Sequence, residues 1–210
     1  MDGTAVKSAF ALLSAKVTKP YGGLNAARYH LKEDKPIERS ISGMVGKGSL
    51  THNSRAFKAK NVKEDYTQHN IEYCNENIKT VYHELFDEAL ERYNAKQTRS
   101  DRKIADYYEK IRTSKQEKLF HEVIFQIGNK DDMNARSRDG ELAKEILDEF
   151  MEEFPKRNPN LRVFSAHLHM DEETPHLHID FVPFVTGSKR GLDTRVSLKQ
   201  ALASQDRKSV

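Results

Sequence analysis

Apolar residues that recur every three or four positions predict helices along the chain. The clearest stripe covers residues 78–93, with Asn75 in front of it as a candidate N-cap. Another stripe opens at Asp139 and Gly140 and is expected to stop at Pro155, because proline cannot continue a helix without losing a backbone donor. Shorter stripes predict further helices at residues 4–17, 104–111 and from Ser197 onward.

Three segments have the composition or alternation of β-strands. Residues 119–127 are rich in β-branched and aromatic side chains, and residues 161–170 and 176–185 are joined by the polar turn at 171–175. Residues 40–63 are polar and basic without clear periodicity, so we expect a loop or a strand edge there. The order of strands and helices predicts an α+β fold, with helices that cover one face of a mostly antiparallel sheet.

Composition excludes a membrane-spanning chain and a disulfide-stabilised one. The 210 residues contain no apolar run of about 18 positions, and the short apolar stretch at residues 9–13 is too brief for a secretory signal. With a mean hydropathy of −0.79, we expect a cytoplasmic protein of one or at most two domains. Cys74 is the single cysteine, so any metal must be held by His, Asp or Glu.

The formal net charge of +3 conceals two basic ends and an acidic middle. Residues 1–63 hold 12 Lys/Arg against 4 Asp/Glu, residues 64–185 hold 17 against 26, and residues 186–210 hold 6 against 2. Basic segments on both sides of a histidine-rich centre favour a partner that carries phosphate.

Four of the nine histidines fall within the two strands around the polar turn. Because strand side chains alternate between faces, His167 and His169 point the same way, and His176 and His178 join them if the strands pair. Imidazole suits divalent transition metals, which polarise phosphate or carbonyl oxygens. The hairpin therefore predicts a metal site on the open sheet face, and the opposite face is expected to pack on the helices through Phe164, Ala166, Leu168, Leu177, Ile179 and Phe181.

Other roles remain open for some of these residues. Any one of the histidines alone also fits a solvated sheet face, whereas four on one face favour the metal. Asp171 and Glu172 fit a turn, but can also orient a ligand or polarise a nucleophile. His121 falls on the apolar face of its strand, so we expect a core histidine there rather than a ligand.

The segment from His169 to His178, HMDEETPHLH, resembles the histidine-rich motif of the Mob/Pre plasmid mobilisation relaxases, the MobV branch of the HUH endonucleases. The name HUH describes two histidines that flank a bulky apolar residue. Two further stretches follow the family order: THNSR, which contains His52, is similar to the first motif, and HNIEY at residues 69–73 to the second. The resemblance covers residues 44–203, and its specificity comes from the three motifs together.

The resemblance implies a metal-dependent enzyme that nicks and rejoins DNA through a covalent protein–DNA intermediate. The expected partner is single-stranded or unwound plasmid DNA, cut at a specific site on one strand of an origin of transfer. His169, His176 and His178 correspond to the metal ligands, with manganese as the expected ion and magnesium or zinc as alternatives. His52 corresponds to the nucleophile and Glu172 to the acidic residue beside it.

Further residues have roles implied by the same resemblance. Arg55 would lie beside the scissile phosphate, and Tyr73 is the alternative nucleophile. His167 lies outside the family pattern and is assigned a supporting or DNA-contact role. The DNA backbone would be held on either side of the site by Arg55, Lys58 and Lys60 near His52, and by Lys189, Arg190, Arg195 and Lys199 after the hairpin. For any one of these lysines, ordinary surface solvation is the alternative.

The resemblance also divides the chain. Residues 1–43 would be an N-terminal extension or linker of unknown role, and residues 44–210 the relaxase catalytic domain. Family members continue into a long helical region that is thought to form dimers. We therefore expect the catalytic domain to be truncated at its C-terminus, and a homodimer only where a longer C-terminal region is present.

Two other functions compete with the relaxase. A nonenzymatic protein could occupy the origin as a repressor and hold a structural metal through the same histidines. An HUH rolling-circle replication initiator or transposase would use a tyrosine, here Tyr73. Initiators more often place that tyrosine on a helix after the HUH motif, and no tyrosine follows Phe184.

Overall fold

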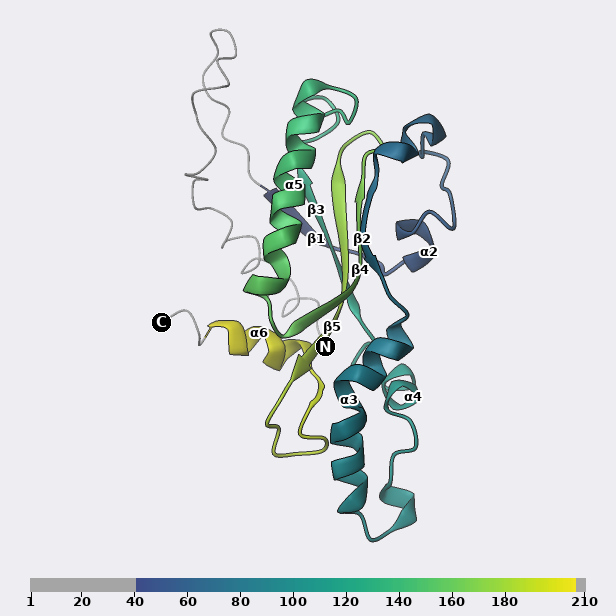
Figure 1. Cartoon of the computed structure of the whole chain (residues 1–210), viewed down its shortest axis with the longest axis vertical. Helices are drawn as coiled ribbons and strands as arrows, with labels where there is room; N and C mark the ends of the chain where they lie inside the picture. Colours follow the sequence, from purple (N-terminus) through teal and green to yellow (C-terminus); the bar gives the residue numbers. More distant parts are fainter. Residues whose placement is uncertain (1–40, 207–210) are drawn as a thin grey trace.

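A six-stranded antiparallel sheet forms the centre of the computed structural model, which describes residues 41–206 (Figure 1). Five strands lie in the order β1-β3-β5-β4-β2, and β6 pairs with β5 at its far end. Their bounds are β1 Ile41–Val45, β2 Ile71–Asn75, β3 His121–Ile127, β4 Leu161–His169, β5 His176–Val185 and β6 Arg195–Val196. The long β4 and β5 form the predicted hairpin at the centre of this sheet, so the histidines lie between neighbouring strands on both sides.

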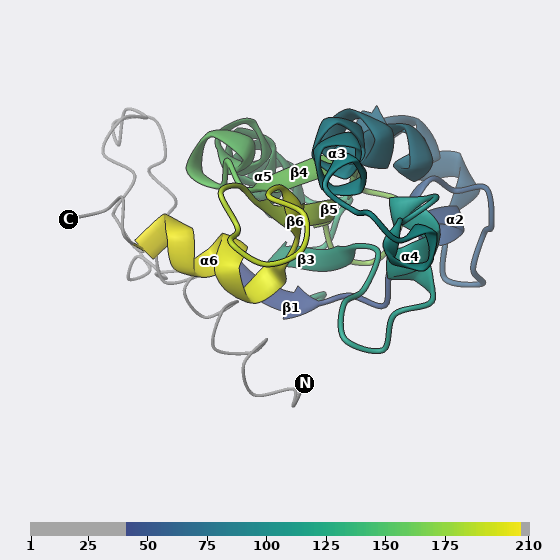
Figure 2. The ribbon, with the colours of Figure 1, turned by 90° about the horizontal axis from the view of Figure 1, so that it is seen from below.

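Helices lie on both faces of the sheet (Figures 1 and 2). The helices are α2 Leu50–Asn53, α3 Ile78–Ala95, α4 Tyr107–Arg112, α5 Arg138–Arg157 and α6 Leu198–Asp206, with 3-10 turns at Glu64–His69 and Ser100–Arg102. On one face α5 and α6 cover an apolar core that includes Phe125, Leu147 and Ile179. On the other face α3 and α4 cover a second core that includes Phe86 and Val182. The histidines lie at the other end of this second face, beyond the part that α3 and α4 cover (Figure 1).

The predicted α+β class is confirmed, and so are the three predicted strands, within a few residues at their ends. The strands β1 and β2 were not predicted as such. β1 begins at Ile41, before the expected domain boundary at residue 44, and pairs with β3 along its whole length. The predicted helix at residues 4–17 lies outside the described part of the chain.

Two helix ends differ from the predictions. The N-cap of α3 is Asn77, whose side chain accepts a hydrogen bond from the Lys79 N–H, and not Asn75, which is the last residue of β2. Helix α5 continues past Pro155 to Arg157, and its C-cap is Asn158, whose backbone N–H and side-chain amide both donate to the Phe154 carbonyl. A proline in the last turn removes only its own intrahelical hydrogen bond, and Asn158 caps the helix end by bonding the otherwise free Phe154 carbonyl.

Phe164 does not lie on the face that the alternation predicted. The register changes in β4, because Val163 pairs with Phe181 and Ser165 pairs with the adjacent Asp180. Phe164 is therefore the extra residue of a β-bulge, and it packs with the α3 core, edge-on to Phe120. The other five residues predicted for the apolar face are all in the α5 core.

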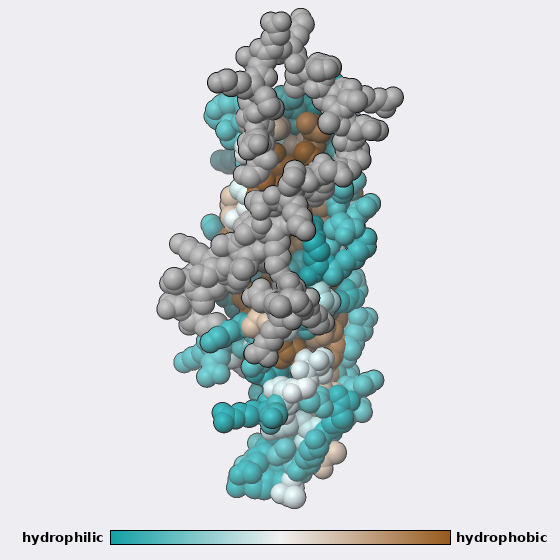
Figure 3. All heavy atoms as spheres, turned by 90° about the vertical axis from the view of Figure 1, so that its left-hand side faces the viewer, coloured by the Kyte–Doolittle hydropathy of each residue, from teal (hydrophilic) through white to brown (hydrophobic). Residues whose placement is uncertain are grey.

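The outer surface is largely hydrophilic on the side that carries α5, where brown apolar atoms show between teal ones (Figure 3). Three large apolar side chains are exposed among the described residues, namely Met44, Val45 and Phe57. Within residues 41–206, no helix has both the length and the apolar character that a membrane crossing requires.

Candidate active site

The four histidines of the hairpin lie on one sheet face, as the alternation predicted. His167 pairs with His178 and His169 with His176 across β4 and β5. The ring centroids of His169, His176 and His178 lie 4.8–5.2 Å from one another. His167 is also buried on this face, with its Nδ1 3.7 Å from a carboxylate oxygen of Glu72.

Each of the three predicted metal ligands has one ring nitrogen held by an oxygen of the protein. His169 Nε2 lies 2.8 Å from the Asn53 carbonyl, and His176 Nδ1 lies 2.8 Å from the Thr174 carbonyl. His178 Nδ1 lies 2.7 Å from the Glu122 carboxylate. Because these oxygens only accept hydrogen bonds, the bound nitrogens carry the protons. The other nitrogen of each ring is left with a free lone pair, the arrangement typical of metal-binding histidines.

The free nitrogens fit a divalent metal. His169 Nδ1 and His178 Nε2 are buried and have no hydrogen-bond partner. Burial lowers the pKa of His169 and of His176, and their neighbouring histidines lower both further, so the imidazoles are neutral at physiological pH. Two groups of three ligand atoms lie within 4.8 Å of one another, His52 with His169 and His178, and His169 with Glu172 and His176. The predicted triad is thus divided between two groups that share His169.

Glu122 is a site residue that the sequence did not reveal. Its carboxylate accepts hydrogen bonds from His178 Nδ1, from the Asn53 amide and from the Gly48 N–H, each at 2.7 Å. A side chain at Gly46 would overlap this carboxylate, so the glycine leaves room for it. Glu122 is the acidic residue between His121 and Val123 on a largely apolar strand, which is the signal that could have found it.

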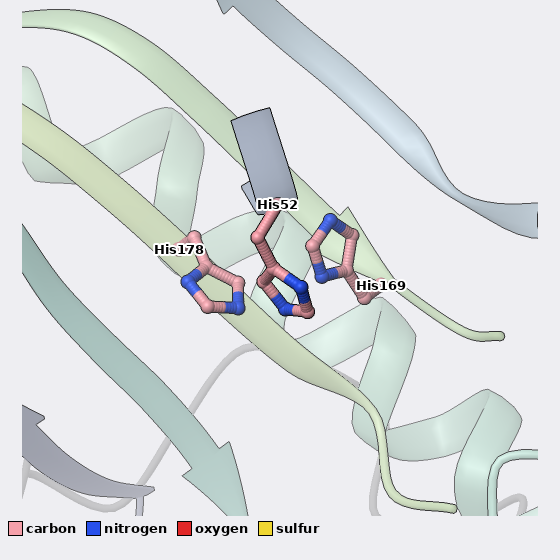
Figure 4. A group of neighbouring side chains, drawn as sticks. All are labelled: His52, His169 and His178. Atoms are coloured by element: carbon pink, nitrogen blue, oxygen red, sulfur yellow. The ribbon is translucent and has the colours of Figure 1, made fainter. Parts of the chain in front are cut away.

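The short helix α2 places His52 over the β4–β5 hairpin. Asn53, the next residue, is buried and donates to both Glu122 and Asp180, so it fixes α2 to β3 and β5. The His52 ring points toward His169 and His178, with centroid separations of 5.9 and 5.8 Å (Figure 4). Its side chain is 24 % exposed. Burial and the nearby Arg55 guanidinium lower the pKa of His52, which favours the neutral, nucleophilic ring.

Arg55 connects His52 to the turn between β4 and β5. Its Nη1 donates to the His52 carbonyl at 3.2 Å and lies 3.3 Å from His52 Nε2. Its Nη2 forms ion pairs with Asp171 and, at 2.9 Å, with Glu172. Arg55 adopts a left-handed backbone with φ of 58°, which is uncommon for a non-glycine residue but is often found just after the C-cap of a helix, here Ser54 of α2. The side chain is only 8 % exposed.

The carboxylates of the turn have different partners. Glu172 lies 3.5 Å from His52 Nε2 and 3.9 Å from His176 Nε2. Asp171 is fully buried. Burial would raise its pKa, but hydrogen bonds from Arg55 and Asn70 hold the pKa of Asp171 below its ordinary value. Asp171 is therefore an anchor for Arg55, whereas Glu172 faces the histidines.

The second motif supports the turn through Asn70. Its side-chain oxygen accepts from the Met170 and Asp171 N–H groups, at 2.7 and 3.2 Å, while its amide donates to the Asp171 carboxylate at 2.7 Å. Tyr73 follows on β2 but packs against the α5 core, and its hydroxyl donates to Asp148 of α5 at 2.7 Å. The structure does not bring Tyr73 to the histidines, because it lies on the opposite face of the sheet.

The predicted DNA-contact residues form two separate groups. Near His52, Lys60 is exposed, and Lys58 is exposed with Glu64 at 3.3 Å. The later group lies beyond Val185, at the end of β5 opposite His176, and comprises Lys189, Arg190, Arg195 and Lys199. At about 3.3 Å per strand residue, it lies roughly 20 Å or more from the histidines. Arg195 is held by Ser188 and Gln200. The later group therefore lies apart from the histidines, and its contact with the DNA backbone stays a prediction.

Comparison with known proteins gives a family and several similar structures. Residues 49–209 match the model of the family Mob_Pre, described as "Plasmid recombination enzyme". The chain is similar to a Mn-bound crystal structure of the MobM relaxase domain (MOBV; Mob_Pre) bound to plasmid pMV158 oriT DNA of 22 nucleotides. The two are 22% identical over 76% of this chain and 75% of that chain, with a TM-score of 0.44. A second Mn-bound structure of that domain, whose DNA carries a 3′-thiophosphate, is 21% identical over 77% of this chain and 76% of that chain, also with a TM-score of 0.44. No curated protein matches the chain.

Proposed function

Because the chain belongs to the Mob_Pre family of plasmid recombination enzymes, we propose that it nicks and rejoins one strand of plasmid DNA at an origin of transfer. The observation that carries the proposal is the position of His52. Its neutral imidazole lies above His169 and His178, whose free nitrogens are buried and without a hydrogen-bond partner. A nucleophile and a set of metal ligands thus share one small site.

The metal would be held by His169, His176 and His178 on the sheet face that His52 covers. When bound, a divalent ion supplies positive charge that neutralises the nonbridging oxygens of the scissile phosphate. A set of imidazole nitrogens suits manganese or zinc better than magnesium, which prefers oxygen ligands. Because manganese also accepts oxygen ligands such as those of a phosphate, we propose manganese as the ion used, with zinc as the nearest competitor.

His52 would attack the scissile phosphorus in line with the bond to the 3′ oxygen. A phosphorus–nitrogen bond forms, the bond to the 3′ oxygen breaks, and the 5′ end of the cut strand stays attached to the protein. The second ring nitrogen gives its proton to Glu172, whose carboxylate lies 3.5 Å from His52 Nε2. That proton then neutralises the departing 3′ oxygen, either directly or through water. The reverse sequence rejoins the strand.

Arg55 would position both reacting groups. It donates to the His52 carbonyl and pairs with Glu172, so it fixes the distance between the nucleophile and the proton acceptor. Tyr73 is a weaker candidate for the nucleophile. Its hydroxyl is bonded to Asp148, and burial followed by that hydrogen bond raises the pKa of Tyr73 well above 10. Attack by Tyr73 would require it to cross the sheet.

The test is a nicking assay on supercoiled plasmids that carry segments flanking the gene, with Mn²⁺, for wild type, His52→Ala and Tyr73→Phe. We expect nicking by wild type and Tyr73→Phe, and a covalent adduct that is acid-labile, as phosphorus–nitrogen bonds are. Nicking that survives His52→Ala but not Tyr73→Phe would refute His52 as nucleophile. Binding of the plasmid without nicking under any metal would favour the repressor.

A further inference from the structure

We propose that, before DNA binds, His52 is itself a metal ligand together with His169 and His178, so that the nucleophile is withheld until a phosphate displaces it. The inference rests on the proposed function and adds a resting state to the same site. Its basis is the group of three ligand atoms from His52, His169 and His178 that lie within 4.8 Å of one another.

The geometry requires little movement. In a tetrahedral site with metal–nitrogen distances of about 2.0–2.1 Å, ligand nitrogens lie about 3.3–3.4 Å apart. The three ligand atoms, which lie within 4.8 Å of one another, therefore need to approach by at most about 1.5 Å. The rings of His169 and His178 are fixed by the Asn53 carbonyl and by Glu122. His52 is on a helix of four residues and its side chain is partly exposed, so it is the member of the group that can adjust.

The second group of ligand atoms is less available in this state. It contains Glu172, whose carboxylate already accepts hydrogen bonds from Arg55 at 2.9 Å and from Asn61 at 2.6 Å. A carboxylate paired with a guanidinium is a poorer ligand, because the cation would have to compete with Arg55. The buried nitrogens of His169 and His178 have no such competitor among the described residues.

Metal binding and nucleophilic attack by His52 exclude each other. A neutral imidazole has one ring nitrogen that carries a hydrogen and one with a free lone pair. The same lone pair cannot bind a cation and attack phosphorus. A DNA phosphate would supply an oxygen ligand in place of His52 and at the same time leave the released imidazole next to the scissile bond. Nucleophile release would thus depend on substrate, which protects the site from premature reaction.

The experiment measures Co²⁺ binding to the DNA-free chain by its visible absorption bands and by calorimetry, for wild type, His52→Ala and His83→Ala. We expect His52→Ala to weaken Co²⁺ binding about tenfold or more and to change the bands, since removing even a group that only orients a ligand costs 10–100-fold. His83→Ala is the matched control, because exposed His83 on α3 lies 3.0 Å from Asp87, and such a surface pair could itself bind Co²⁺. It should leave the affinity unchanged.

A measurement on wild-type protein keeps the test independent of the variant's folding. Long-range ¹H–¹⁵N spectra with Zn²⁺ should show a metal-bound nitrogen on His52, which is lost when a single-stranded dT₂₀ oligonucleotide is added. Equal Co²⁺ affinity of wild type and His52→Ala, together with an unshifted His52 ring, would overturn the resting state and leave the proposed function intact. Absence of any metal binding by wild type would overturn both.

Discussion

Replacement of Glu122 by glutamine should weaken metal binding without touching a metal ligand. The carboxylate accepts from three donors, and an amide offers only one accepting atom. If the Gln oxygen faces His178 and Asn53, its NH₂ group meets the Gly48 N–H, and one buried donor loses its partner, at a cost of about 1–3 kcal/mol. If the amide is reversed, His178 must move its proton to Nε2, the nitrogen that would bind the metal. In either orientation we expect a 10–100-fold loss of metal affinity.

The assay is a Mn²⁺ or Co²⁺ titration alongside urea unfolding of the metal-free chain. Glu122→Gln should lower the free energy of unfolding by about 1–3 kcal/mol in addition to its effect on affinity. Glu117→Gln is the matched control: burial raises the pKa of Glu117, and none of the hydrogen bonds in the histidine cluster reaches it, so its loss of charge should leave both quantities nearly unchanged. Wild-type affinity in Glu122→Gln would refute the argument that this carboxylate sets the tautomer of His178.

Three further predictions concern acid stability, packing and DNA. Burial, and to a smaller extent the nearby Lys118, lowers the pKa of His121 to about 4. Between pH 6.5 and about 4, His121 is therefore protonated in the unfolded chain but neutral in the folded chain, so the free energy of unfolding falls as the pH drops through that window. Between pH 7 and 5, the free energy of unfolding from urea titrations should therefore fall by about 2 kcal/mol less in His121→Phe than in wild type. Parallel pH profiles of the two proteins would contradict this. Gly46→Ala should cost about 1–3 kcal/mol, because the added methyl overlaps the Glu122 carboxylate; an unchanged midpoint of thermal unfolding would show that the loop simply moves aside. Phe57 is 61% exposed in the loop after α2, where it can stack on a DNA base, so Phe57→Ala should weaken binding of a dT oligonucleotide by about 1–3 kcal/mol in fluorescence anisotropy. Met44 on β1 is 51% exposed and is the control: Met44→Ala should leave binding unchanged, and equal losses in the two variants would argue against stacking.

The histidine face could be predicted from the sequence because it depends on local geometry. Period-two alternation along two strands joined by a five-residue turn is enough to place His169, His176 and His178 together. The same reasoning failed at Phe164, since a bulge adds one residue and alternation cannot anticipate where a strand becomes irregular. Asn77 was missed as a cap for a related reason: two asparagines lie before the same apolar stripe, and only the path of the chain after β2 selects between them.

The partners of the histidines could not be predicted, because they come from distant parts of the chain. Glu122 reaches His178 only through the pairing of β3 with β5, and Asn53 reaches Glu122 and His169 only through the docking of α2. The resemblance to a family named His52, Arg55 and Glu172, but not Asn53, which fixes the helix that carries His52. The position of Tyr73 is also a tertiary property: the change of register between Glu72 and Cys74 in β2 accompanies its packing on the α5 side.

The bulge in β4 has a consequence for how the chain can change in length. Because Phe164 is an extra residue between two regular pairings, its loss would restore plain alternation and leave His167 and His169 facing as they do. Deletion of Ala166, by contrast, would turn the histidines toward α5 if the pairings before it were kept. The aromatic half of the strand and the histidine half can therefore gain or lose one residue relative to each other only at this point. Insertions and deletions that preserve the site should concentrate there.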